Sequence, residues 1–229
     1  LCQTDEEKTA MLHAQNRGAF RVACEKGHLE IAMWLRGLCK TVEEQKAMLH
    51  AKDNWAFFWV CGNGHLNMAK WLWGLCQTAE EKTAMLHARD DWAFRLACQK
   101  GHIEIAKWLW GLCQTDEEKT AMLHTRNDLV FGCACQEGHI EIAKWLWDLC
   151  QTSKEQSTML HEDNDFAFRS ACEHGHLEIA QWLWKVCPDE EQYAMLHADD
   201  DYAFRGACEY GHLKLAKWLW SECKTPDKQ

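Results

Sequence analysis

The sequence predicts an all-α fold, a helical-repeat solenoid of six stacked repeats. The first observation is a Gly-His pair that returns six times at a period of about 37 residues. The second is that apolar positions follow helical spacing, while nothing alternates with the period of two typical of strands. Repeats of roughly 20–50 residues are typical of solenoids, because one repeat cannot bury its apolar face without its neighbours. The pairs are Gly27-His28, Gly64-His65, Gly101-His102, Gly138-His139, Gly175-His176 and Gly211-His212.

A cysteine that recurs before Gln-Thr or Lys-Thr sets the boundaries of the repeats. They span residues 2–38, 39–75, 76–112, 113–149, 150–186 and 187–222, and a polar tail follows at 223–229. We therefore expect a single solenoid array over residues 1–229. Leu1-Cys2 corresponds to the end of a repeat's last helix, so we expect the chain to begin inside a longer array.

Each repeat is expected to open with a short capped helix, at residues 78–87 in repeat three. There Thr78 is followed three residues later by Glu81, a capping box in which hydroxyl and carboxylate accept backbone N–H groups at a helix start. In repeat six Pro188, which suits a first helical turn, replaces the Thr. The other pairs are Thr4 and Glu7, Thr41 and Glu44, Thr115 and Glu118, and Thr152 and Glu155.

Two further helices complete the repeat. In repeat three they are expected at residues 92–98 and 103–113, with Gly101 ending the first of them in a left-handed conformation. On the second, Trp110 lies on the apolar stripe, so we expect it in the core, where it interlocks neighbouring repeats. Trp108 lies beside the polar face and is expected to be partly exposed.

Repeat three contains the run Phe94-Arg95-Leu96-Ala97-Cys98-x-x-Gly101-His102-Ile103-Glu104-Ile105-Ala106-Lys107-Trp108-Leu109. This run resembles the helix–turn–helix part of the ankyrin repeat, and the resemblance extends over essentially the whole chain. The family's Thr-Pro-Leu-His-x-Ala-Ala stretch falls on residues 92–98, where its Thr, Pro and His are replaced, so the family's Thr–His hydrogen bond cannot form. Extended repeats of this type resemble those in ankyrin proteins of giant viruses and intracellular bacteria.

The resemblance carries three implications. The repeat is about four residues longer than the family's usual length of roughly 33, so the helix at 78–87 is expected to replace or shorten the family's β-hairpin finger. The imidazole of His102 is expected to bridge neighbouring turns by hydrogen bonding. The family's binding groove would lie on the finger tips and on the two residues before each Gly-His pair.

Fourteen cysteines raise the question of disulfides. All but Cys133 fall in two rows, one near the Gly-His turn and one at the far end of the last helix. Stacked helices about 8–10 Å apart exceed the roughly 7 Å Cα separation that a disulfide allows. We therefore expect small buried thiols in a reducing, cytoplasmic compartment. No apolar run approaches the roughly 20 residues of a membrane helix.

Three other classes of function are disfavoured. Cys98 and His102 lie four residues apart, but a zinc site needs about four converging ligands and the next such pair is a full repeat away, so no metal or other cofactor is expected. No phosphate loop, nucleophile elbow or single asymmetric catalytic constellation occurs, so no enzyme is expected. The 14 tryptophans could stack bases, but a net charge of −10 and a pI of about 5.7 disfavour nucleic acid.

The finger tips become acidic toward the C-terminal end, which favours a basic segment of a partner. The alternative is that these carboxylates cap helix starts and keep an apolar array soluble. Phe58 stands where most other repeats carry Arg, and it is either an aromatic anchor for a partner or packs under the neighbouring finger. The predicted partner-binding residues are Asp91, Asp128, Asp163, Asp165, His174, Asp199, Asp200, Asp201, Tyr210 and Phe58.

These observations predict a non-enzymatic scaffold that binds a protein partner, through a basic segment, on its concave face. Two alternatives stay open at this point. One is a structural module that self-associates end to end through uncapped terminal repeats, and the other is a Cys/His metal-binding array. Neither nucleic acid nor a membrane is expected as a partner.

Overall fold

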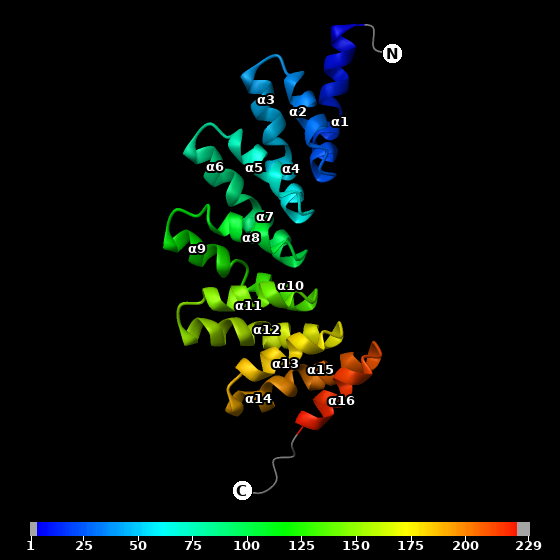
Figure 1. Ribbon diagram of the computed structural model, residues 1–229, viewed down its shortest axis with the longest axis vertical. Helices are drawn as coiled ribbons and strands as arrows, with labels where there is room; N and C mark the ends of the chain where they lie inside the picture. Colours follow the sequence, from blue (N-terminus) through cyan, green and yellow to red (C-terminus); the bar gives the residue numbers. More distant parts are fainter. Residues whose placement is uncertain (1–3, 224–229) are drawn as a thin grey trace, which may run out of the picture. The chain divides into compact units, whose positions relative to one another are not determined.

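The computed structural model describes residues 4–223, and these residues form sixteen α-helices and no strand (Figure 1). The predicted all-α helical-repeat fold is therefore confirmed. The chain divides into two compact units, Leu1–Met122 and Leu123–Gln229. The expectations for Leu1-Cys2 and for the tail beyond Cys223 lie outside the described residues. A single array across both units stays a prediction.

Each repeat in Figure 1 contributes a short helix, a turn and an antiparallel helix pair that meets at the Gly-His turn. In unit 1, α4 packs against α1 and α7, and in unit 2, α12 packs against α10 and α15. The helices of unit 1 are α1 (Asp5–Glu25), α2 (Leu29–Gly37), α3 (Val42–Leu49), α4 (Ala51–Gly62), α5 (Leu66–Gly74), α6 (Ala79–Leu86), α7 (Ala88–Gln99) and α8 (Ile103–Trp110), and α9 (Asp116–Leu123) ends one residue beyond it. Those of unit 2 are α10 (Leu129–Gln136), α11 (Ile140–Leu149), α12 (Ser153–Glu173), α13 (Leu177–Val186), α14 (Asp189–Leu196), α15 (Ala198–Glu209) and α16 (Leu213–Glu222).

The short helices begin as the capping motif predicts. At the start of α6, the Glu81 N–H donates to Thr78 Oγ1 at 3.2 Å. The Glu81 carboxylate accepts the N–H of Gln77, one residue before the Thr, at 2.9 Å. In α1 the carboxylate of Glu7 instead accepts the N–H of Thr4 itself, at 3.1 Å. Both arrangements satisfy donors that a helix start would otherwise leave unpaired.

A left-handed turn of three residues joins each short helix to the next helix where the described residues include it. In repeat three, Arg89, Asp90 and Asp91 have φ of 56°, 55° and 55°. Such conformations cost about 1–2 kcal/mol for each L-residue and are best tolerated by Asn and Asp. The consecutive left-handed residues were not predicted from the sequence and are a finding of the structure. The equivalent turns are residues 52–54, 126–128, 163–165 and 199–201.

The Gly-His turn links each helix pair to the preceding repeat. Gly101 has φ of 82° and ends α7, as predicted. The His102 Nε2–H donates to the carbonyl of Gly62 in the repeat before, at 3.1 Å, so the bridging role that the resemblance implied is confirmed. A Cβ on Gly64 would lie 2.8 Å from His102 Cε1, so that glycine also makes room for the ring. Equivalent bonds run from His65 to Glu25, His176 to Gln136 and His212 to Glu173.

Aromatic rings interlock neighbouring repeats inside each unit. Trp73 lies 6.2 Å from Phe57 of its own repeat and 6.3 Å from Trp108 of the next, between ring centroids. Unit 2 repeats this pattern with Phe131, Trp147 and Trp182. Trp110 is half-buried beside Phe94, so the expectation that it is fully enclosed in the core is wrong. Both tryptophans of the last helix of a repeat contribute to this packing. The second, such as Trp73, contacts the Phe of its own repeat, and the first, such as Trp108, contacts the Phe of the repeat before.

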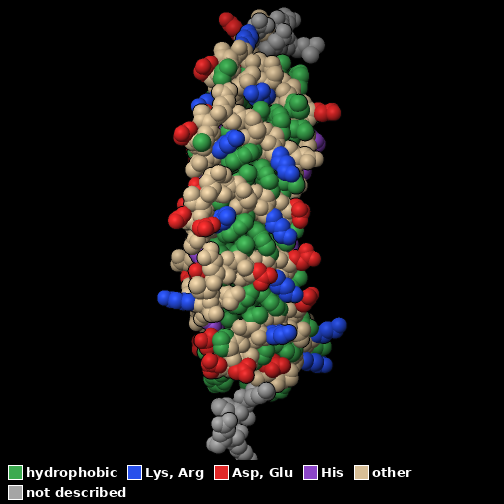
Figure 2. Space-filling view, turned by 60° about the vertical axis from the view of Figure 1, so that its left-hand side comes forward, with side chains coloured by type: hydrophobic (Ala, Val, Ile, Leu, Met, Phe, Trp, Pro, Cys, Tyr) green, Lys and Arg blue, Asp and Glu red, His purple; other side chains and the backbone are tan. Residues whose placement is uncertain are grey.

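The described cysteines from Cys24 to Cys223 are free thiols, and most of them are buried. Burial raises the pKa of Cys24 to about 12 and that of Cys61 further. Such thiols are inert small hydrophobes, in agreement with the interpretation from sequence. No helix within residues 4–223 combines the length and apolarity needed to span a membrane. On the face drawn in Figure 2, hydrophobic side chains form separate patches between acidic and basic ones.

Candidate functional site

A hydrogen bond from a histidine to the last residue of the turn, Asp in four repeats and Asn in one, closes each left-handed turn of the described residues. His87, at the C-cap of α6, lies with Nδ1 2.7 Å from Asp91 Oδ1, the last residue of the turn. His124 and His161 pair with Asp128 and Asp165 in the same way, at 2.6 Å. His197 pairs with Asp201, and in repeat two His50 pairs with Asn54 at 2.6 Å. We name this feature the His–Asp clasp.

The clasp changes the role of three predicted contact residues. Asp91, Asp128 and Asp165 are only 7%, 5% and 6% exposed. Desolvation raises the pKa of Asp128, and the hydrogen bond from His124 opposes that rise. Burial and the bond to histidine therefore give these carboxylates an internal role, instead of the partner contacts expected from sequence.

In repeats three, five and six, an arginine stands five residues after the middle residue of the turn. Its guanidinium donates hydrogen bonds to backbone carbonyls of the turn. Arg95 Nε donates to the carbonyl of Asp90 at 2.9 Å, and its Nη2 donates to that of Arg89 at 3.3 Å. Arg169 donates likewise to Asn164 and Asp163, at 2.7 and 2.9 Å, and Arg205 to Asp200 at 3.0 Å. Each guanidinium also lies over an aromatic ring, Arg95 on Trp92 at 4.7 Å and Arg169 on Tyr202 at 5.3 Å.

Repeat two carries Phe58 at this arginine position. The ring is 3% exposed and meets Trp92 of the next repeat edge-on, with 6.4 Å between centroids. The Arg89 guanidinium lies 5.5 Å from its centre. Phe58 therefore packs under the neighbouring finger, and the expectation that it anchors a partner is wrong.

Repeat four carries Gly132 at this position, and a cavity of about 250 Å³ opens beside it. The cavity is lined by the turn at residues 126–128, by Glu162 and Asp163 of the following turn, and by Phe166. A Cβ on Gly132 would lie 2.5 Å from Phe166 Cδ1, so the ring already leans into part of the space. The analysis of the sequence missed this site. The signal was present, because Gly interrupts a row that reads Arg21, Phe58, Arg95, Gly132, Arg169 and Arg205.

The remaining predicted contacts in unit 2 present side chains to solvent. Asp163 and Asp200 are exposed on their turns, and Asp199 is exposed while paired with Arg169 at 2.8 Å. Asp201 is exposed although His197 holds it. His174 is also exposed, with Nδ1 2.9 Å from the Ser170 carbonyl, and Tyr210 is 57% exposed.

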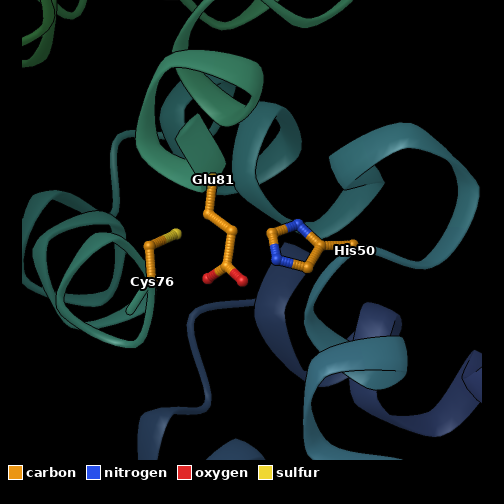
Figure 3. Close-up of side chains that lie close together, drawn as sticks. All are labelled: His50, Cys76 and Glu81. Carbon is orange, nitrogen blue, oxygen red and sulfur yellow. The ribbon is translucent and has the colours of Figure 1, made fainter. Parts of the chain in front are cut away.

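Side chains that could bind a metal converge away from Cys98 and His102, the pair considered in the sequence. The imidazole of His102 already uses Nε2 on the Gly62 carbonyl, and so does not turn toward Cys98. Two other groups of His, Cys and Glu converge among residues 4–223. They are His50, Cys76 and Glu81, drawn in Figure 3, and His161, Cys187 and Glu191.

Comparison with known proteins gives one family match, to the middle of the chain. Residues 94–185 match the family model described as ankyrin repeats in three copies. A solved ankyrin repeat family protein from Legionella pneumophila is 18% identical to the chain, with a TM-score of 0.47 and coverage of 98% of this chain and 78% of that chain. Comparison with the curated proteins gives no match. Residues 94–185 are therefore similar to three ankyrin repeats, and in this segment a short helix precedes each helix pair.

Proposed function

We propose that the chain is a non-enzymatic scaffold that binds a basic segment of a partner protein on the left-handed turns of repeats four to six. Ankyrin repeats generally mediate protein–protein interaction. The observation that carries the finer proposal is the cavity beside Gly132. The free, buried thiols are in keeping with a reducing compartment, the cytoplasm.

The chain's own repeats supply the chemistry for this cavity. Where Arg169 is present, its guanidinium donates to the turn carbonyls of Asn164 and Asp163 and lies on the ring of Tyr202. At repeat four the same backbone turn and an aromatic ring, Phe166, border a cavity where the side chain of Gly132 is absent. An arginine from a partner would reproduce the missing contacts, a cation–π contact among them.

The charges around the cavity favour a cation. Besides Asp128, which His124 holds, the carboxylates of Glu162 and Asp163 line it, with one basic residue, Arg126. Asp200 adds a further exposed carboxylate on the same row of turns in unit 2. Exposed carboxylates of this kind steer a basic partner and lose strength as salt rises. Tyr210 and His174 remain the proposed contacts beside the Gly-His turns.

A direct test uses acetyl-arginine-methylamide and its neutral counterpart acetyl-citrulline-methylamide as probes in NMR titrations of the whole chain. The proposal expects the arginine probe to shift the amide resonances of Gly132 and Phe166. The affinity of the citrulline probe for the same residues should be at least about tenfold weaker. Equal effects of the two probes, or effects spread over the surface, would overturn the cavity as an arginine site.

A pull-down from cytosolic lysate tests the same surface with a natural partner. Gly132→Arg fills the cavity from within, and the proposal expects binding to fall about ten- to hundredfold. Gly74→Arg is the matched control, because it adds the same charge where a side chain meets nothing within 4 Å. Asp163→Lys and Asp200→Lys test the acidic row, since both carboxylates are exposed. Retention of the same partners by all four variants would sink the proposal.

Self-association is a second candidate, favoured by the exposed face of α16. Leu213 is 65% exposed and Trp220 is 71% exposed. Light scattering over a range of concentrations would reveal growing assemblies if this face pairs with another copy. Trp220→Ser would then shift the equilibrium back to the monomer, and a size that never changes with concentration would exclude this candidate.

A further inference from the structure

Three side chains from two neighbouring repeats of unit 1 converge beside the short helix α6. His50 ends α3, Cys76 follows α5, and Glu81 lies in the first turn of α6. One ligand atom from each lies within 4.8 Å of the other two. In Figure 3 the imidazole of His50 faces the Glu81 carboxylate, and the sulfur of Cys76 points to the same place from the other side.

The hydrogen bonding of His50 fixes which ring nitrogen can act as a ligand. Its Nδ1 lies 2.6 Å from Asn54 Oδ1, an acceptor, while Asn54 Nδ2 donates to the carbonyl of Ala84. Nδ1 therefore carries the proton, and Nε2 of the neutral ring carries a lone pair. Nε2 is buried and has no hydrogen-bond partner, and it faces the thiol and the carboxylate. A buried acceptor of this kind is complete when it meets a cation or a donor.

The other two groups also favour a cation. Burial, with a smaller contribution from the charge of Glu81, raises the pKa of Cys76 to about 11. Glu81 is held in place by the Gln77 N–H and by an ion pair with Lys46 at its outer side. A divalent cation stabilises a thiolate beside a carboxylate, because it adds positive charge between the two negative groups.

Unit 2 brings the same three residue types together, with the difference that the histidine Nε2 already contacts the glutamate. His161, Cys187 and Glu191 lie within 4.8 Å of one another. His161 Nε2 is 2.8 Å from a Glu191 oxygen, and Nδ1 is 2.6 Å from Asp165. A carboxylate on Nδ1 of a histidine, with Nε2 turned to further ligands, is the arrangement that orients histidine in many metal sites.

We propose that each of these two groups binds one zinc ion through a histidine Nε2, a cysteine sulfur and a glutamate oxygen. Zinc accepts this mixture of ligands, and a water would complete four-coordination. Binding releases the thiol proton of the cysteine, so that a Zn–S bond forms with no change of oxidation state. Each ion would tie two successive repeats together, repeats two and three in unit 1 and repeats five and six in unit 2. This proposal is independent of partner binding.

The sequence supplies a control inside the same chain. His87, Cys113 and Glu118 occupy the corresponding positions of repeats three and four. They do not appear among the converging groups, of which the described part of the chain has two. Cys113 is as buried as Cys76, and burial raises its pKa to about 11 as well. Cys113→Ser therefore removes a matched thiol outside the two proposed sites.

The test is equilibrium dialysis of the whole reduced chain against zinc chloride, followed by elemental analysis. The proposal expects about two zinc ions per chain at micromolar free zinc, a loss of one in Cys76→Ser and in Cys187→Ser, and no loss in Cys113→Ser. Cobalt as a probe would give a thiolate-to-metal charge-transfer band that falls by about half in each of the first two variants. Far-ultraviolet circular dichroism reports whether each variant is folded, and Cys76→Ala replaces Cys76→Ser if that variant is not.

Two results would overturn the proposal. One is a folded wild type that holds no zinc after dialysis. The other is equal zinc content in the wild type, Cys76→Ser and Cys187→Ser, which would place the metal on other residues. A further check is thermal unfolding, in which zinc should raise the Tm of the wild type more than that of the double variant.

Discussion

The turns of repeats three and four share a backbone conformation but differ in what fills the space behind them. Residues 89–91 have φ of 55–56°, and residues 126–128 have φ of 50–55°. Both turns are closed by a His–Asp clasp, at 2.7 and 2.6 Å. Behind the first lies the buried guanidinium of Arg95, whereas behind the second lies Gly132 with its cavity.

The two turns distinguish the role of the His–Asp clasp from the role of the arginine. Because the turn of repeat four is left-handed without an arginine, the clasp is the feature that all the described turns share. The arginine fills space and adds hydrogen bonds, and its loss leaves a cavity without a change of backbone. A repeat can therefore open a cavity at one position and keep the backbone of its turn.

The largest expected effect is from breaking the clasp where no arginine supports the turn. Asp128→Ala leaves the left-handed turn without its hydrogen bond and should lower the free energy of unfolding by about 2–3 kcal/mol. Asp91→Ala should cost less, because Arg95 still holds that turn. Urea denaturation, with hydrogen exchange at the turn amides, measures the two losses. Equal losses would contradict the division of roles between clasp and arginine.

Arg95→Gly converts repeat three into the form of repeat four. The change removes two hydrogen bonds and the contact with Trp92, and it places glycine inside a helix, so we expect a loss of about 2 kcal/mol. Arg95→Ala removes the same contacts without placing glycine in the helix, so it should be less destabilising than Arg95→Gly by about 1 kcal/mol. The NMR titration with acetyl-arginine-methylamide should then show a second site, at Trp92. Absence of any second site would mean that the Phe166 environment, and not the missing arginine, defines the cavity.

Gly132→Ala reports how tightly Phe166 packs. The new Cβ would meet the ring at 2.5 Å, so overpacking should outweigh the usual helix gain of alanine and lower stability by about 1 kcal/mol. Gly74→Ala, in open space, should show no loss. In a double-mutant cycle, Phe166→Ala should relieve the penalty at residue 132. Additive effects would show that the two residues do not contact each other.

The smallest effect is expected from Asp128→Asn. Asn54 already performs the same role in repeat two, with its Oδ1 2.6 Å from His50. The variant keeps an acceptor and a residue that tolerates the left-handed region, so the loss should stay below about 1 kcal/mol. A loss as large as that of Asp128→Ala would mean that the charge of the carboxylate, and not its hydrogen bond, closes the turn.

Periodicity and capping residues were sufficient to predict the all-α fold, the short helix at Thr78 and the left-handed Gly101. These features depend on neighbours in sequence, which one chain displays in full. The burial of Asp91, Asp128 and Asp165 could not be predicted in this way, because Asp in a polar stretch has the same appearance whether it faces solvent or a histidine.

The candidate sites depend on contacts between repeats. The convergence of His50 with Cys76 and Glu81 joins side chains from different repeats, and no spacing within one repeat reveals it. The cavity could have been predicted from the sequence, because Gly132 stands at a position where the other repeats have larger residues. What could not be foreseen is that Phe166 would fill only part of the space.

The Gly-His turn has a consequence for how the chain unfolds. Within each unit, the ring of such a histidine rests on the glycine of the repeat before it, as His212 does on Gly175, where a Cβ would lie 2.6 Å from the ring. Loss of order in one repeat therefore removes a packing partner from the preceding one, which couples neighbours as in a one-dimensional cooperative lattice. Nothing lies within 4 Å of the corresponding position on Gly211. Amide exchange in unit 2 should accordingly be fastest around Gly211 and slow progressively toward Gly138.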